Sequence, residues 1–90
     1  MRITWDRRKA AANVKKHGVE FDEALTVLAS TMTVRFEYNH HDEHRFIATG
    51  YSRRARILVV VYCYRFDDEI RIISARAATR KERRQYEEGI

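Results

Sequence analysis

The densest group of side chains able to bind a charged ligand lies over Arg71–Arg84. This run contains five arginines and one lysine against the single carboxylate of Glu82, a net charge of +5 that equals the formal charge of the whole chain. Guanidinium groups remain charged at physiological pH and bind phosphate through two parallel hydrogen bonds. The run therefore indicates a surface for the backbone of RNA or DNA. A solvated helix face balanced by Glu87 and Glu88 is the alternative interpretation.

The spacing of these cations predicts how they are arranged. At 100° per residue, Arg80, Arg83 and Arg84 fall within an arc of about 100° on one helix face. Arg76 comes just before that helix, at the exit of a predicted strand. We expect Arg76, Arg80 and Arg83 to surround one phosphate, with Lys81 and Arg84 in further contact with nucleic acid.

Groups that can move a proton occur in two places. Tyr86 lies on the far side of the helix from Arg80, where it either anchors the helix or places a phenol in a cleft. A polar turn supplies histidines and carboxylates, namely His40, His41, Asp42, Glu43 and His44. Histidine titrates near neutral pH, so we expect Glu43 or His44 to act as base or acid. Zinc is the other reading of this turn, but His40 and His44 would share a face only on a helix, and we expect no metal.

A second basic group lies in a predicted turn over Ser52–Arg56. Arg53, Arg54 and Arg56 either contact phosphate or keep the turn soluble and protect the sheet edge. We assign these three residues, together with Arg45 on the preceding strand, to RNA binding.

Composition limits the remaining classes. Ninety residues, 44% apolar and 34% charged, predict one folded domain spanning 1–90. Cys63 is the single cysteine, which excludes an intrachain disulfide framework and any CxxC site. The longest apolar run, Ile57–Tyr64, is too short for a membrane helix, which needs about 20 residues. We expect a cytoplasmic protein with no membrane association.

The elements that must position these residues follow from periodicity. A helical period over Arg7–His17 begins after Asp6 as N-cap and ends at Gly18, and a second helix is predicted from Glu23 to about Ala29 with Asp22 as its cap. A period of two then predicts strands at Thr33–Tyr38, Arg45–Tyr51, Ile57–Tyr64 and Glu69–Ala77. The segment Asn39–Glu43 is a predicted turn. Thr79 and Glu82 form a predicted capping box for a helix ending near Glu88.

This order predicts an α+β fold. The short segment Ile3–Trp5 is a strand or lead-in, and two helices precede a four-stranded antiparallel meander. Ile57–Tyr64 is apolar on both faces and is expected to be the most buried strand. We expect the helical pair to pack on one face of the sheet.

Three segments resemble the BrnT toxins. The opening pattern comprises Trp5, Asp6, Lys9, Asn13, Lys16, His17, Gly18, Val19, Phe21, Glu23 and Ala24. The middle strand contributes Glu43, Arg45, Phe46, Ile47 and Gly50. The closing motif runs through Arg71–Ala77 and continues with Thr79, Glu82, Arg83, Tyr86 and Glu87. Many members have Lys where this chain has Ala77, which removes one cationic contact.

The resemblance implies a bacterial type II toxin of the RelE-like ribonuclease superfamily, which inhibits translation by cleaving RNA, with or without the ribosome, and needs no cofactor. It implies an RNA cleft on the sheet face opposite the two helices. It also implies a BrnA-like ribbon-helix-helix antitoxin, through which alone the complex would bind operator DNA. A non-enzymatic nucleic-acid-binding module, or a basic subunit that only receives an acidic partner, remains the alternative. In the toxin reading, the phosphate would be held by Arg76, Arg80 and Arg83, with Tyr86 as a candidate acid.

Overall fold

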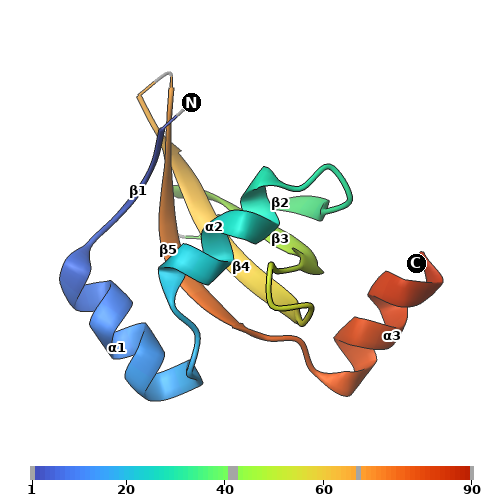
Figure 1. The fold of residues 1–90 in the computed structure, drawn as a ribbon. Coiled ribbons are helices and arrows are strands. Elements are labelled where there is room, and N and C mark those ends of the chain that lie inside the picture. The colour runs from blue at the N-terminus through green and yellow to red at the C-terminus, as the bar shows by residue number, and fades with distance from the viewer. Residues whose placement is uncertain (1, 41–42, 67, 90) are drawn as a thin grey trace.

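Five strands form one mixed sheet in the order β1-β5-β4-β3-β2 in this computed structural model, which describes residues 2–40, 43–66 and 68–89 (Figure 1). The strands are β1 (Arg2–Trp5), β2 (Val34–His40), β3 (Glu43–Tyr51), β4 (Ile57–Arg65) and β5 (Glu69–Ala77). The helices are α1 (Arg7–His17), α2 (Phe21–Ala29) and α3 (Arg80–Glu88). The predicted α+β class and the antiparallel meander of β2 to β5 are confirmed.

The sheet has a fifth strand beyond the predicted four. β1 pairs in parallel with β5, so that Arg2 lies opposite Glu69 and Trp5 opposite Ile72. The buried Glu69 carboxylate fixes this register, because it accepts hydrogen bonds from Arg2 Nη2 at 2.7 Å and Thr4 Oγ1 at 2.9 Å. The pairing of β1 with β5 joins segments that are far apart in the sequence, so no local sequence pattern predicts it. The hairpins of the meander, by contrast, are marked in the sequence by their turn residues.

The helix ends follow the capping predictions with one correction. The Asp6 carboxylate accepts hydrogen bonds from the backbone of Arg8 and Lys9, and Gly18 ends α1 in the left-handed conformation at φ 70°. The prediction of Asp22 as the second N-cap is wrong, because α2 already begins at Phe21. Burial of the Phe21 ring against Trp5, with ring centroids 6.0 Å apart, accounts for this earlier start.

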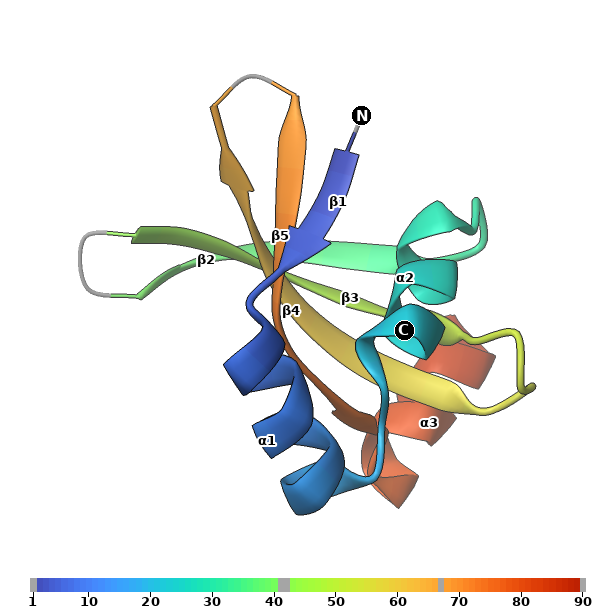
Figure 2. The same ribbon diagram turned by 60° about the vertical axis from the view of Figure 1, so that its left-hand side comes forward.

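The core lies between one face of the sheet and the pair α1 and α2 (Figures 1 and 2). β4 is central and supplies Leu58, Val60 and Tyr62, each at most 1% exposed. Asn13 joins α1 to the sheet, because its amide nitrogen donates to Val19 and Ala75 carbonyls and its amide oxygen accepts from Ala75 N. The buried central strand and the helical pair on one face are as predicted.

Strand bounds differ from prediction at the β2–β3 hairpin. β2 extends to His40 and β3 begins at Glu43, so the predicted turn Asn39–Glu43 is too long. At the tip of this hairpin both faces of the two strands carry polar residues, so the alternation of apolar and polar residues that marks a strand is absent from the sequence. Residues 41–42 lie outside the described part of the chain.

Among the described elements, α3 lies on the opposite face of the sheet and covers one end of it. The predicted capping box starts this helix: Thr79 Oγ1 accepts from Glu82 N at 3.1 Å, and Glu82 Oε1 accepts from Thr79 N at 2.9 Å. α3 contains no buried residue. The helix therefore lacks a buried apolar face, and individual side-chain contacts attach it to the sheet.

Candidate functional site

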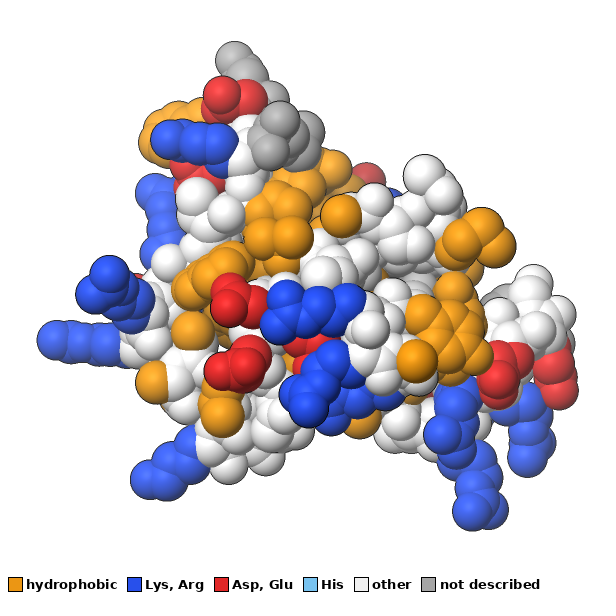
Figure 3. All heavy atoms as spheres, viewed as in Figure 1, with side chains coloured by type: hydrophobic (Ala, Val, Ile, Leu, Met, Phe, Trp, Pro, Cys, Tyr) orange, Lys and Arg blue, Asp and Glu red, His pale blue; other side chains and the backbone are white. Residues whose placement is uncertain are grey.

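The two long sides of α3 carry different chemistry. Glu82, Gln85 and Tyr86 face the sheet and line a hollow with it. Arg80, Arg83 and Arg84 line a separate surface depression with Glu87 and Glu88. We call these three arginines the outer arginine face. In the space-filling view, Lys and Arg side chains project outward from the region of α3 (Figure 3).

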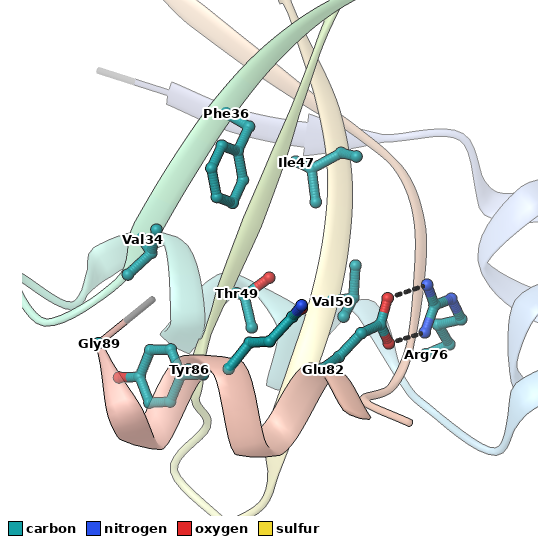
Figure 4. A pocket seen from close by; sticks show the side chains of 10 residues that line it. Val34, Phe36, Ile47, Thr49, Val59, Arg76, Glu82, Tyr86 and Gly89 are labelled. Carbon is teal, nitrogen blue, oxygen red and sulfur yellow. Dashed lines mark hydrogen bonds and ion pairs between the residues drawn. The ribbon is translucent and has the colours of Figure 1, made fainter. Parts of the chain in front are cut away.

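An apolar hollow of about 370 Å³ lies between α3 and the open sheet face. Neighbouring strands supply its floor, because Val34, Thr49, Val59 and Arg76 lie side by side in the sheet register. Its lining consists of Val34, Phe36, Ile47, Thr49, Val59, Arg76, Glu82, Gln85, Tyr86 and Gly89. Figure 4 shows Phe36, Ile47 and Val34 from the strands facing Tyr86 and Glu82 from the helix.

Arg76 and Glu82 form a two-bonded ion pair at one end of the apolar hollow (Figure 4). Arg76 Nη1 donates to Glu82 Oε1 at 2.7 Å, and Nη2 donates to Oε2 at 2.8 Å. These bonds hold the pKa of the Glu82 carboxyl at about 2 and raise the pKa of Arg76. Glu82 thus serves both as a helix cap and as the counter-charge of Arg76, and the pair leaves the apolar hollow without net charge.

The predicted cluster of three arginines around one phosphate is not assembled. Arg76 borders the apolar hollow, while Arg80 and Arg83 lie in the other depression. None of the outer arginines forms an ion pair within the described residues. Arg83 also borders a neighbouring depression that contains Tyr51 and Glu87. Lys81, predicted to contact RNA, is exposed on the same helix.

Two tyrosines attach α3 to the sheet. Tyr86 Oη donates to the Met32 carbonyl at 2.9 Å, and its ring meets that of Tyr51 edge-on with centroids 5.7 Å apart. Tyr51 Oη donates to Glu87 Oε2 at 3.4 Å. Partial desolvation and the nearby Glu87 carboxylate raise the pKa of Tyr51, and Arg83 opposes this effect. Tyr86 therefore fulfils both predicted options, because it anchors α3 and lines the apolar hollow.

The turn between β3 and β4 is held by a buried carboxylate, Glu23, to which the sequence analysis assigns no structural role. Glu23 is 1% exposed and accepts Arg56 Nε at 2.7 Å, Arg56 Nη2 at 2.6 Å and Ser52 Oγ at 2.6 Å. The Arg56 guanidinium, with Ser52, holds the pKa of the Glu23 carboxyl at about 2. The assignment of Arg56 to RNA therefore needs correction: its guanidinium is engaged with Glu23. Arg54 lies 4.0 Å from the same carboxylate, and Arg53 is exposed.

Glu43 and His44 lie at the other end of the sheet from α3. The β2–β3 register places them five or six residues from Thr49, which at about 3.3 Å per residue is roughly 16–20 Å away. Figure 2 shows this hairpin pointing away from α3. His44 is exposed, and the side chain of Glu43 lies outside the described part of the structure. The structure therefore does not bring either predicted proton-transfer residue to the outer arginine face. Arg45, on the same strand as His44, is half-buried.

Among the described side chains, no group of three or more His, Cys, Asp and Glu residues is placed to hold a metal ion. His41 and Asp42 of the polar turn are outside the described range. Within the same range, no helix is long and apolar enough to cross a membrane.

Sequence reasoning did not place Gln85 or Tyr51 in this region, and it named Glu82 as a capping residue and Glu87 as a counter-charge without assigning either to the site. The helical period does contain a signal for two of them. Glu82, Gln85 and Tyr86 follow the i, i+3, i+4 spacing that marks one helix face, opposite to the arginines. Tyr51 is placed only by the pairing of β3 with β4, opposite Ile57.

Comparison with known proteins identifies the family and the fold. Residues 5–82 match the family model described as the ribonuclease toxin, BrnT, of type II toxin-antitoxin systems. The crystal structure of the Brucella abortus ribonuclease toxin BrnT is similar, with a TM-score of 0.67 and 24% sequence identity over 89% of this chain and 99% of that one. At that identity the likeness shows a common fold. No curated protein matches the sequence.

Proposed function

Because this chain belongs to the BrnT family of ribonuclease toxins of type II toxin–antitoxin systems, we propose that it inhibits translation as a metal-independent, RelE-like endoribonuclease. The observation that carries the proposal is the family match over residues 5–82, which includes the strand and first helical turn leading to the outer arginine face. A surface of guanidinium groups that form no ion pair with any described residue, beside an open sheet face, suits single-stranded RNA.

The reaction requires no group beyond amino-acid side chains. A ribose 2′-oxygen attacks the adjacent phosphorus and loses its proton to a base, and the bond from phosphorus to the 5′-oxygen breaks as an acid protonates that oxygen. The products are a 2′,3′-cyclic phosphate and a 5′-hydroxyl. Negative charge develops on the phosphate in the transition state, where preorganised guanidinium groups stabilise it most.

We assign the charge-stabilising role to Arg80 and Arg83. They are exposed, charged and without an ion-pair partner among the described residues, so they lose little when they bind phosphate. Arg76 must exchange its carboxylate partner Glu82 for phosphate before it can join them. This makes Arg76 a weaker candidate for the same site.

The groups beside Arg83 that can move a proton are Glu87 and Tyr51, which contact each other. Tyr86 is adjacent and remains a candidate acid, although its hydroxyl proton is directed to Met32. Glu43 and His44 would serve a phosphate at α3 only if the RNA or the hairpin moved by many ångströms. Their place in the proposal is therefore contact with RNA farther along the sheet.

A type II system contains an antitoxin, and we propose a BrnA-like ribbon-helix-helix protein as the partner of this chain. Its inhibitory segment would cover the outer arginine face with acidic or helical residues. The complex would bind operator DNA through the antitoxin alone.

The test is cleavage of RNA by the purified chain. Mapped 5′ ends should appear at defined positions and bear a hydroxyl group, and with free mRNA they should form equally in the presence of EDTA. The assay is run with free mRNA and with ribosomes programmed with the same message. Binding without cleavage in both arrangements would favour the non-enzymatic alternative.

A further inference from the structure

The apolar hollow differs chemically from the outer arginine face beside it. Its charged residues neutralise each other, since Arg76 binds Glu82 through two hydrogen bonds. Val34, Ile47 and Val59 supply an aliphatic floor. Phe36 remains 56% exposed at its edge. The hollow is therefore suited to a flat, uncharged and largely apolar group rather than to a phosphate.

Two neutral polar side chains in the hollow have no hydrogen-bond partner in the described part of the chain. Tyr86 Oη is used by Met32, but neither the Thr49 hydroxyl nor the Gln85 amide forms a hydrogen bond with any described residue. A glutamine amide offers two donors and one acceptor in a plane, and threonine offers a donor and an acceptor. These are the groups that pair with the edge of a nucleobase.

We infer that the apolar hollow binds one unpaired nucleobase of the RNA, stacked on Phe36 and read at its edge by Gln85 and Thr49. The inference rests on the proposed function for its choice of RNA. The charge pattern supports this occupant, because the phosphates of the same strand meet the outer arginine face while the neutral base enters the neutral hollow. The volume, about 370 Å³, falls in the range of small-ligand sites.

A base bound in the hollow would fix the position of the RNA strand along the protein. A base held on the sheet side of α3 places its flanking phosphates beside the helix, so only certain phosphates reach Arg83. Sequence preference would then come from Gln85 and Thr49, and affinity from stacking and from the arginines.

The experiment uses 2′-O-methyl oligoribonucleotides, which lack the attacking hydroxyl and remain intact. Affinity is measured by fluorescence anisotropy for wild type, Phe36→Leu, Gln85→Ala and Thr49→Val. The matched control is Phe66→Leu, because Phe66 is also an exposed aromatic ring, 80% accessible, in the turn after β4 and outside the hollow. Loss of stacking at Phe36 should weaken binding about 5- to 100-fold, with no change for the control.

A second set of oligonucleotides carries one abasic position, moved along the strand. One position should lose affinity in wild type and lose nothing further in Phe36→Leu. Gln85→Ala and Thr49→Val should change the preference among the four bases at that position. Circular dichroism and thermal unfolding confirm that each variant is folded before its affinity is interpreted.

The outcomes separate this inference from the proposed function. Equal affinity of Phe36→Leu, Gln85→Ala and wild type for RNA would overturn the base site even if natural RNA is cleaved. Loss of antitoxin binding without loss of RNA binding in the same variants would assign the hollow to a protein segment and also overturn it. Base-dependent binding with no cleavage of natural RNA would uphold the site and contradict the ribonuclease activity.

Discussion

At the scale of single residues, the partner of each arginine decides what it can bind. Arg56 and Arg76 hold carboxylates through two hydrogen bonds, whereas Arg80, Arg83 and Arg84 have no ion pair among the described residues. When an arginine exchanges a carboxylate for a phosphate, its net gain in binding free energy is only the difference between two similar interactions. Composition and spacing alone do not distinguish the arginines that bind a carboxylate from those that do not. The difference becomes visible only in the folded structure.

We expect Arg80→Ala and Arg83→Ala each to lower the rate of RNA cleavage by about 10²–10³, because each removes a charged hydrogen bond made in the transition state. Arg76→Ala should cost less in rate. The free energy of unfolding should change by about 0–1 kcal/mol for the two exposed arginines. Single-turnover cleavage by folded variants measures the first effect and urea unfolding the second.

Arg53→Ala is the control for this series, since Arg53 is exposed in the turn between β3 and β4. It should weaken RNA binding modestly and reduce its salt dependence without altering the chemical step. Full toxicity of both Arg80→Ala and Arg83→Ala would remove the outer arginine face from the site.

Glu23→Gln should destabilise the fold and flatten its pH dependence. The pKa of Glu23 is about 2 when folded and near 4.5 when unfolded, so its contribution is complete above pH 4.5 and is lost as the pH falls toward 2. The shift corresponds to roughly 3 kcal/mol for this carboxyl, whose side chain is 2% exposed. Unfolding free energies of wild type and variant should converge between pH 4.5 and 2. Parallel curves over that range would contradict the ion-pair account.

Glu23 belongs to the opening pattern that resembles the BrnT toxins, but its structural role could not be predicted from the sequence. It stands in the first turn of α2, where an acidic residue is ordinary, and its partner Arg56 lies 33 positions later. Only the docking of the β3–β4 turn onto α2 buries the carboxylate. By contrast, the roles of Asp6, Gly18, Thr79 and Glu82 as caps depend on residues within four positions and were predictable.

At the scale of elements, β4 and α3 should differ most in hydrogen exchange. β4 lies inside the sheet and is buried from Ile57 to Val60, whereas α3 has no buried residue. Exchange should be slowest at residues 59–61 and fast along Arg80–Glu88, and Thr79→Ala should quicken it further at the helix start. Mass spectrometry of exchanged peptides measures both. Fast exchange at residues 59–61 would contradict the observed sheet order.

The bounds of an element were predictable where neighbouring residues in the sequence determine them. They were not predictable where contacts between distant parts of the chain determine them. α1, β5 and α3 have the expected bounds because capping residues or turns flank them. α2 starts early because Phe21 packs against Trp5, a contact across 16 positions. β1 was predicted as a strand, but its place beside β5 depends on Glu69 and on the parallel register.

The candidate site follows the same division. The sequence was sufficient to predict that Arg76 lies at the end of a strand and that the arginines up to Arg84 lie on the helix that follows. The proximity of Tyr51 to Tyr86 and the distance from Glu43 to α3 were not, because both depend on how β3 pairs with its neighbours.

At the scale of the whole molecule, the outer arginine face should be covered in the antitoxin complex. Coexpression with the proposed BrnA-like antitoxin should give a stable complex and restore growth, because acidic groups that neutralise this face also exclude RNA. Size-exclusion chromatography and growth curves measure the two effects. Arg80→Ala combined with Arg83→Ala should weaken the complex at low salt more than at high salt. A chain that is harmless alone and binds nothing from its own operon would contradict the proposal.

The parallel pairing of β1 with β5 has a consequence for biosynthesis. The first strand leaves the ribosome early, yet Glu69, which holds Arg2, is joined to the chain 67 residues later. The nascent polypeptide thus cannot complete its sheet edge until β5 has been made, and α3 follows only after that. A chain built in this order acquires its arginine-bearing helix only after all five strands of the sheet have been synthesised.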